Sequence, residues 1–170
     1  MMNLRTPIRL AALLALAVAA LGASAGDGPR DPVPAAAFDG QASVALRAMK
    51  ARADELHVSG VAVVACAQGD SVASWRSMML VVGGMTQAPK ADDKGANLLG
   101  IAYAKASEMA STLKDSGNGG RPPMTGEFGW HGGVVAKGRT GILIAAFSGG
   151  RDQDDLSISR AGLAALAGSL

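Results

Sequence analysis

Residues 140–170, TGILIAAFSGGRDQDDLSISRAGLAALAGSL, hold the sequence pattern that decides the fold. The apolar run Gly141–Phe147 is short enough for one buried β-strand, and the glycines of Ser148–Gly150 end it. A helix then begins through three aspartates within residues 152–155, because carboxylates complement the positive end of a helix dipole and cap its N–H groups. The stretch therefore predicts a strand, a glycine break and a helix.

One face of this predicted helix carries its apolar residues. Gly162 lies inside the helix and is expected to weaken it by up to about 1 kcal/mol relative to alanine. The aspartates of the first turn could alternatively bind a cation, but capping accounts for their position. The face comprises Leu156, Leu163, Ala167 and Leu170, with Ser159 filling the remaining turn.

The first 25 residues have the layout of a secretory signal peptide. Arg5 and Arg9 give a positively charged start, Leu10–Leu21 is apolar, and residues 23–25 form a small-x-small cleavage site. The apolar run is about a dozen residues long, short of the roughly 20 that span a bilayer. An uncleaved anchor is the alternative. The sequence predicts a periplasmic or secreted protein with no stable membrane anchor after cleavage.

The predicted mature chain carries balanced charge. The full chain has 16 Lys and Arg residues against 14 Asp and Glu residues, a formal net charge of +2. The excess belongs to Arg5 and Arg9, so cleavage of the signal peptide leaves 14 basic and 14 acidic residues. Because no Lys/Arg cluster remains to follow a phosphate backbone, the composition predicts no nucleic-acid partner.

The rest of the chain is predicted to form a flexible mature N-terminus at residues 26–38 and a single domain at residues 39–170. Apolar periodicity predicts helices at Gln41–Leu56 and Lys94–Lys114, the second capped by Asp92 or Asp93. Strand patterns precede and follow the second helix. They cover Val58–Cys66, Ser71–Met79, Glu127–Ala136 and Gly141–Phe147.

This order of elements predicts an α+β fold, α-β-β-α-β-β-α. Two hairpins would form one central antiparallel sheet flanked by helices. The segment Asp115–Gly126 holds four glycines and two prolines and has no periodicity. Such a loop inside a compact domain is usually functional or mobile.

The sequence contains no recognisable catalytic or metal-binding motif. Its two histidines and one cysteine form no His-Glu-x-x-His or Cys-x-x-Cys pattern, and it has neither a Gly-x-Ser-x-Gly elbow nor a P-loop. Cys66 is predicted to be a buried, inert thiol, with a reactive thiol or an intermolecular disulfide as the alternative. The methionines are predicted to fill gaps in the core rather than to bind a metal.

His131 is the main candidate for ligand binding. It lies between Gly129-Trp130 and Gly132-Gly133, where glycines permit close approach of a ligand and Trp130 offers a flat apolar face. Such an imidazole could hold a planar cofactor such as heme, with His131 as the metal ligand. The alternative is a solvent-facing loop histidine beside a core tryptophan. His57 ends the first helix, where the dipole favours a cation, so a structural role competes with ligand binding.

Two arginines complete the candidate ligand contacts. Arg151 follows Ser148–Gly150, which resembles an anion-binding nest because backbone N–H groups point outward there. The acids just downstream oppose an anion. Either Arg151 or Arg139, in the turn after residue 137, could pair with a ligand carboxylate such as a heme propionate.

The C-terminal third of the chain resembles the GlcG/HbpS family of heme-binding proteins, which also occurs as the C-terminal domain of some corrinoid adenosyltransferases. The matching features are a Gly-Gly hairpin, an apolar strand, a Ser-Gly-Gly break, a Gln-Asp pair and an Ala-Gly-Leu helix. Here they are Gly132-Gly133, Gly141–Phe147, Ser148–Gly150, Gln153-Asp154 and Ala161–Leu163. Gly69, Arg76 and Lys105-Ala106 fit the family pattern more weakly.

The resemblance implies an α+β fold, frequent homo-oligomers and heme binding in several members, without one shared activity. The leading hypothesis is an exported small-ligand-binding protein whose ligand is heme or a related tetrapyrrole. Two alternatives stay open. One is a heme-degrading or other small-molecule enzyme acting near Asp115–Gly133, and the other is a non-catalytic accessory module that forms oligomers.

Overall fold

The computed structural model describes residues 35–139 and 141–167, so the predicted signal peptide lies outside the described residues. Among the residues described, no helix is long and apolar enough to cross a membrane. In chain order the elements are α1 (Ala35–Glu55), β1 (Gly60–Gln68), β2 (Trp75–Val82), β3 (Thr86–Gln87), β4 (Ala96–Asn97), α2 (Leu98–Thr112), β5 (Gly133–Lys137), β6 (Gly141–Ser148) and α3 (Asp152–Ala167).

The main sheet has four antiparallel strands in the order β2-β1-β6-β5. Each outer pair is a hairpin, and the two hairpins join through β1 and β6, which pair from Val61↔Ser148 to Gln68↔Gly141. The α+β class and the sheet built from two hairpins are therefore confirmed.

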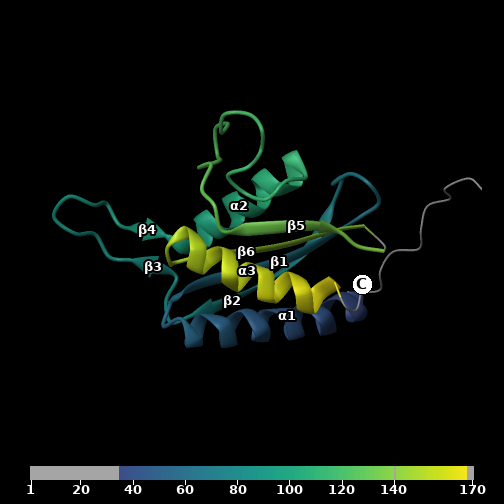
Figure 1. The fold of residues 1–170 in the computed structure, drawn as a ribbon, viewed down its shortest axis with the longest axis horizontal. Helices are drawn as coiled ribbons and strands as arrows, with labels where there is room; N and C mark the ends of the chain where they lie inside the picture. The colour runs from purple at the N-terminus through teal and green to yellow at the C-terminus, as the bar shows by residue number, and fades with distance from the viewer. Residues whose placement is uncertain (1–34, 140, 168–170) are drawn as a thin grey trace, which may run out of the picture.

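The helices cover both faces of this sheet (Figure 1). Helices α1 and α3 pack on one face and α2 packs on the other. The central strands β1 and β6 are consequently buried on both faces, which explains why each is a continuous apolar run rather than an alternating one. The largest fully buried side chains are Phe38, Phe147, Met49, Met109, Leu143, Ile144, Ile158 and Leu166.

The predicted starts of α1 and β5 are wrong by six residues each, and those of β2 and α2 by four. Helix α1 begins at Ala35, six residues before the predicted start, and Phe38 in its first turns is buried, so the predicted domain boundary at residue 39 falls inside this helix. Strand β5 begins at Gly133 rather than at Glu127. Gly129 and Gly132 take positive φ angles of 65° and 122°, which an extended strand cannot accommodate.

The segment before α2 contains two short strands that the sequence did not predict. Strands β3 and β4 form a separate two-stranded ribbon through Thr86↔Asn97 and Gln87↔Ala96. Asn97, rather than Asp92 or Asp93, caps α2, because its side chain accepts a hydrogen bond of 3.0 Å from the backbone N–H of Gly100.

The buried face of α3 is rotated from the predicted one. Leu156 and Leu163 are only partly buried, Ala167 is exposed, and Leu170 lies outside the described residues. Gly162 packs against α1, because a Cβ there would lie 2.5 Å from Met49 Cγ and Sδ. The missing side chain at residue 162 thus weakens the helix but lets it pack against Met49. The buried residues of α3 are Asp155, Ile158, Ser159, Gly162 and Leu166.

A buried ion pair ties α3 to the opposite side of the sheet. Lys105 Nζ of α2 donates to Asp155 Oδ2 at 2.8 Å and to the carbonyl of Phe147 at 2.9 Å. Each side chain of the pair is only 4% exposed. Burial raises the pKa of the Asp155 carboxyl, against the opposing effect of Lys105. Such a pair fixes positions more than it adds net stability, since desolvation offsets the attraction between the charges.

Asp155 also occupies the predicted anion-binding nest. Its Oδ1 accepts a hydrogen bond of 2.8 Å from the N–H of Gly150. The N–H group of Gly150, which an external anion would need, is therefore taken by the protein's own carboxylate. This agrees with the expectation that the acids just downstream of Ser148–Gly150 oppose an external anion.

The buried Lys105–Asp155 pair and the neighbouring Ser159 also fix the chain at the start of β5. The carbonyl of Gly132 accepts hydrogen bonds from Ser159 Oγ at 2.6 Å and from the N–H of Phe147 at 3.3 Å. A Cβ at residue 132 would lie 2.6 Å from both Asp155 Cβ and Lys105 Nζ. Only glycine allows this close approach. The loop that precedes β5 is thus held against α2 and α3.

Replacing Asp155 with Asn should lower the free energy of unfolding by about 3–5 kcal/mol, because Lys105 would stay buried without a countercharge. Denaturant titration at neutral pH measures the change. Asp152→Asn, an exposed acid of the same helical turn, should cost less than about 1 kcal/mol. Equal effects of the two substitutions would contradict the structural role of the buried pair.

Candidate functional site

An aromatic cleft lies between the loop before β5 and the start of α2. Phe128 and Trp130 form its wall, with ring centroids 4.7 Å apart and planes inclined by 26°. Both side chains are 49% exposed. Two large stacked rings left in solvent are an uncommon use of apolar surface, since such residues are normally buried or hold a ligand or partner. The core position for Trp130, one of the alternatives considered, is wrong.

The floor of this aromatic cleft is made of small and aliphatic residues. Gly100, Ile101 and Ala104 contribute from α2, while Gly95–Asn97 and Gly126 complete the lining. The cleft has a volume of about 420 Å³, within the range of roughly 300–1,000 Å³ typical of small-molecule sites. A stacked aromatic wall over a floor with few large side chains suits a flat apolar ligand.

An ion pair holds the loop that carries the wall. Arg121 binds Glu127 through two hydrogen bonds, of 2.6 Å from Nη1 to Oε2 and 2.7 Å from Nη2 to Oε1. Glu127 Oε2 also accepts a hydrogen bond of 2.8 Å from the N–H of Met124. The side chain of Glu127 is 8% exposed. The hydrogen bonds from Arg121, and next that from Met124, lower the pKa of Glu127 from 4.5 to about 2.

His131 lies beside the aromatic cleft rather than in it. Its side chain is exposed, and a Cβ on Gly117 would lie 2.6 Å from its Nδ1. The imidazole therefore rests on the loop after α2, whereas Trp130 faces the first half of that helix. The structure places the two predicted neighbours on different sides of the chain.

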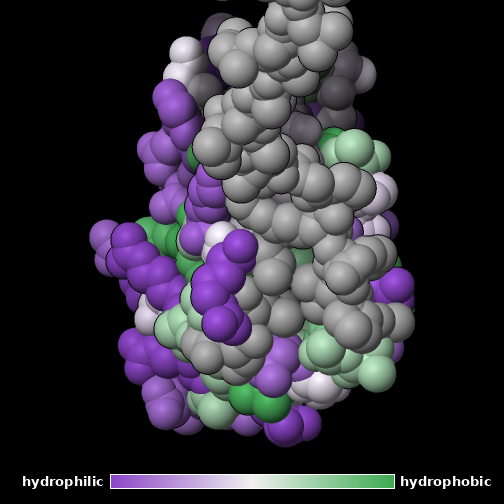
Figure 2. Space-filling view, turned by 90° about the vertical axis from the view of Figure 1, so that its right-hand side faces the viewer, coloured by the Kyte–Doolittle hydropathy of each residue, from purple (hydrophilic) through white to green (hydrophobic). Residues whose placement is uncertain are grey.

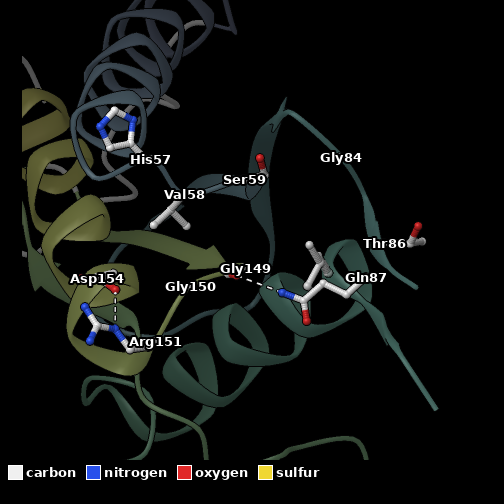
Figure 3. Close-up of a pocket in the computed structure, with 11 residues that line it drawn as sticks. His57, Val58, Ser59, Gly84, Thr86, Gln87, Gly149, Gly150, Arg151 and Asp154 are labelled. Carbon is white, nitrogen blue, oxygen red and sulfur yellow. Dashed lines mark hydrogen bonds and ion pairs between the residues drawn. The ribbon is translucent and has the colours of Figure 1, made fainter. Parts of the chain in front are cut away.

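A second, polar cleft of about 480 Å³ brings together two other predicted residues, His57 and Arg151. Figure 3 shows them at the ends of α1 and β6, with Gln87 from the β3–β4 ribbon forming the facing wall. His57 takes a positive φ angle of 55° immediately after α1. It reaches this cleft because the chain turns there toward β1.

Three polar groups of this second cleft bond within the protein. Arg151 Nε donates to Asp154 Oδ2 at 3.0 Å, which raises the arginine pKa further, and Gln87 Nε2 donates to the carbonyl of Gly149 at 2.9 Å (Figure 3). The N–H of Gly150 is bonded to Asp155. An anion in the polar cleft would therefore meet Asp154 beside Arg151, and the aromatic cleft is the better candidate site.

Arg139 lies far from both clefts, in the turn between β5 and β6. Strand β6 has eight residues, so its two ends lie about 23 Å apart at 3.3 Å per residue. Arg151 follows one end and Arg139 precedes the other. Figure 2 faces the end with this turn, and hydrophilic residues form much of its visible surface. The two arginines cannot contact one ligand together.

The remaining candidates for chemistry are buried or dispersed. Cys66 is buried, and burial raises the pKa of its thiol, which agrees with the predicted inert role. Within the described part of the chain, no group of three or more His, Cys, Asp or Glu side chains is placed to hold a metal ion.

Comparison with known proteins supports the fold. The chain matches the crystal structure of a PduOC:heme complex with a TM-score of 0.51 and 16% sequence identity, over 74% of this chain and 91% of that one. The two chains share a fold. No protein-family model matches the sequence, and no curated protein matches it. Membership of the GlcG/HbpS family thus stays a prediction from the C-terminal motif.

The sequence analysis identified Trp130 but missed Phe128, the other residue of the aromatic wall. It also missed the Arg121–Glu127 ion pair that holds the loop. Phe128 and Trp130 stand two residues apart in the sequence, on either side of Gly129, and their rings stack in the folded chain. This spacing was the available signal. Arg121 and Glu127 are separated by two prolines and a glycine, and no helical or strand period connects them.

At low pH, protonation of Glu127 should break its ion pair with Arg121 and free the loop that carries Phe128 and Trp130 before the protein unfolds. Because the folded-state pKa of Glu127 is depressed, its contribution is complete above about pH 4.5 and disappears as the pH falls toward 2. In a Trp75→Phe variant, Trp130 is the remaining tryptophan and its fluorescence reports the transition. Adding Glu127→Gln should abolish this acid transition while circular dichroism stays unchanged. An identical transition in both proteins would contradict the assignment.

Proposed function

We propose that this protein binds heme or a related planar tetrapyrrole in the aromatic cleft. The observation that carries the proposal is the exposed stack of Phe128 on Trp130 above the small residues of α2. A planar ligand would cover ring faces that water now contacts. Each 100 Å² of apolar surface removed from water contributes about 2.5 kcal/mol. An aromatic contact adds about 0.5–1.5 kcal/mol.

The residues that line the cleft suit contact with the flat ring of such a ligand more than coordination of its metal ion. Gly100 and Ala104 leave space for a flat face, and Phe128 and Trp130 provide stacking partners. A bound heme would supply a redox-active iron with axial positions for protein or external ligands. His131 is the candidate axial ligand, but its ring lies on Gly117, so ligation would require residues 130–132 to reorient.

The shared fold supports the ligand class without fixing it. The matched structure is a heme complex, which is a property of that protein. At 16% identity the similarity concerns the fold, and the case for this chain depends on its own cleft. Export to the periplasm or the medium, and assembly into homo-oligomers, are further parts of the proposal that await direct measurement.

Titration of residues 26–170 with hemin tests the proposal through the Soret band. Trp130→Ala and Phe128→Ala should each weaken binding about tenfold or more, because each loses a stacking face. Val44→Ala removes a comparably exposed apolar side chain from α1, across the sheet from α2, and should leave affinity unchanged. An unshifted Soret band throughout the titration would refute heme binding.

The axial ligand needs a separate test. The chain has two histidines, so His57→Ala is a matched control for His131→Ala. If His131 ligates the iron, its removal shifts the Soret maximum of the complex, while His57→Ala leaves the spectrum as it was. A spectrum that survives His131→Ala would exclude this residue as the ligand and leave ring stacking as the source of affinity.

A further inference from the structure

We propose that the Arg121–Glu127 ion pair is a positioning device that sets the affinity of the aromatic cleft. This inference rests on the proposed function. Neither side chain lines the cleft, yet Glu127 lies between three lining residues, Gly126, Phe128 and Trp130. Any movement of residue 127 must move its covalent neighbours, so the ion pair affects ligand binding by setting the positions of Phe128 and Trp130.

The loop from residue 121 to residue 131 has no helix or strand to hold it. Its position depends on side-chain bonds at residue 127 and on a turn, in which the N–H of Glu127 donates to the carbonyl of Met124 at 2.9 Å. Arg121 Nη2 also donates to Ser111 Oγ of α2 at 3.3 Å. The guanidinium thus connects the loop to the helix that forms the cleft floor.

The geometry of the pair suits this role. A bidentate arginine–carboxylate contact fixes orientation as well as distance, which a lysine, as a point charge, does not. Glu127 is 8% exposed and Arg121 is 31% exposed, so solvent competes little at the carboxylate. Gly126 and Gly129 on either side have φ angles of 94° and 65°, so the chain between them follows a path that depends on external contacts.

Loss of the pair would leave the wall to be ordered at the moment of binding. Fixing one residue costs about 1–2 kcal/mol in backbone entropy, and a loop already ordered avoids that cost when a ligand binds. Ordering even one residue on binding therefore weakens affinity about tenfold. Kinetically, a wall that opens more often should release its ligand faster.

The test measures two quantities in the Trp75→Phe background, where Trp130 is the reporter. Acrylamide quenching without ligand reports the exposure of the wall, and hemin titration reports affinity. Glu127→Gln and Arg121→Ala should each raise quenching and weaken hemin binding about tenfold, and Arg121→Lys should restore part of both. Arg160→Ala removes the same charge from an exposed site on α3 and should change neither.

The outcomes separate this inference from the proposed function. Raised quenching with unchanged hemin affinity in Glu127→Gln would overturn the inference, as would unchanged quenching. If the parent protein binds no hemin, the proposed function fails. In that case raised quenching in Glu127→Gln would still support the pair as the element that holds the wall, and unchanged quenching would refute it.

Discussion

The buried ion pair between Lys105 and Asp155 is the contact on which the rest of the arrangement depends. It joins α2, on one face of the sheet, to α3, on the other, around the end of β6. Asp155 simultaneously accepts a hydrogen bond from the N–H of Gly150 in the glycine break, and Ser159, on the same helix, donates to the carbonyl of Gly132. The end of the wall-bearing loop that leads into β5 is thereby placed relative to α2.

The fold could largely be predicted because its main signals are local. The central strands are covered on both faces, so burial produces continuous apolar runs that mark β1 and β6 in the sequence. The acidic start of α3 was also recognisable. Its partner was not, because Lys105 lies 50 residues earlier and only the folded chain brings the charges together. For the same reason Asp155 was assigned to capping, with cation binding as the alternative, and not to an ion pair.

The candidate site was less predictable, because it combines a loop without periodicity and a helix with ordinary composition. Trp130 was identified from its glycine-rich surroundings, but His131 was placed on the same side of the chain, and the structure turns it toward Gly117. Arg139 and Arg151 carry suitable charge, yet they lie at opposite ends of β6. Residue type indicated the chemistry, and only the fold could say which residues share a cleft.

The central claim is that the aromatic cleft, rather than the polar cleft, is the ligand site. Amide and indole NMR shifts during titration with gallium protoporphyrin IX, a diamagnetic analogue of heme, test it most directly. The account predicts that shifts concentrate at the Trp130 indole and at Gly100, Ile101 and Ala104. Shifts that concentrate at His57, Gln87 and Arg151, with the Trp130 indole unmoved, would contradict it.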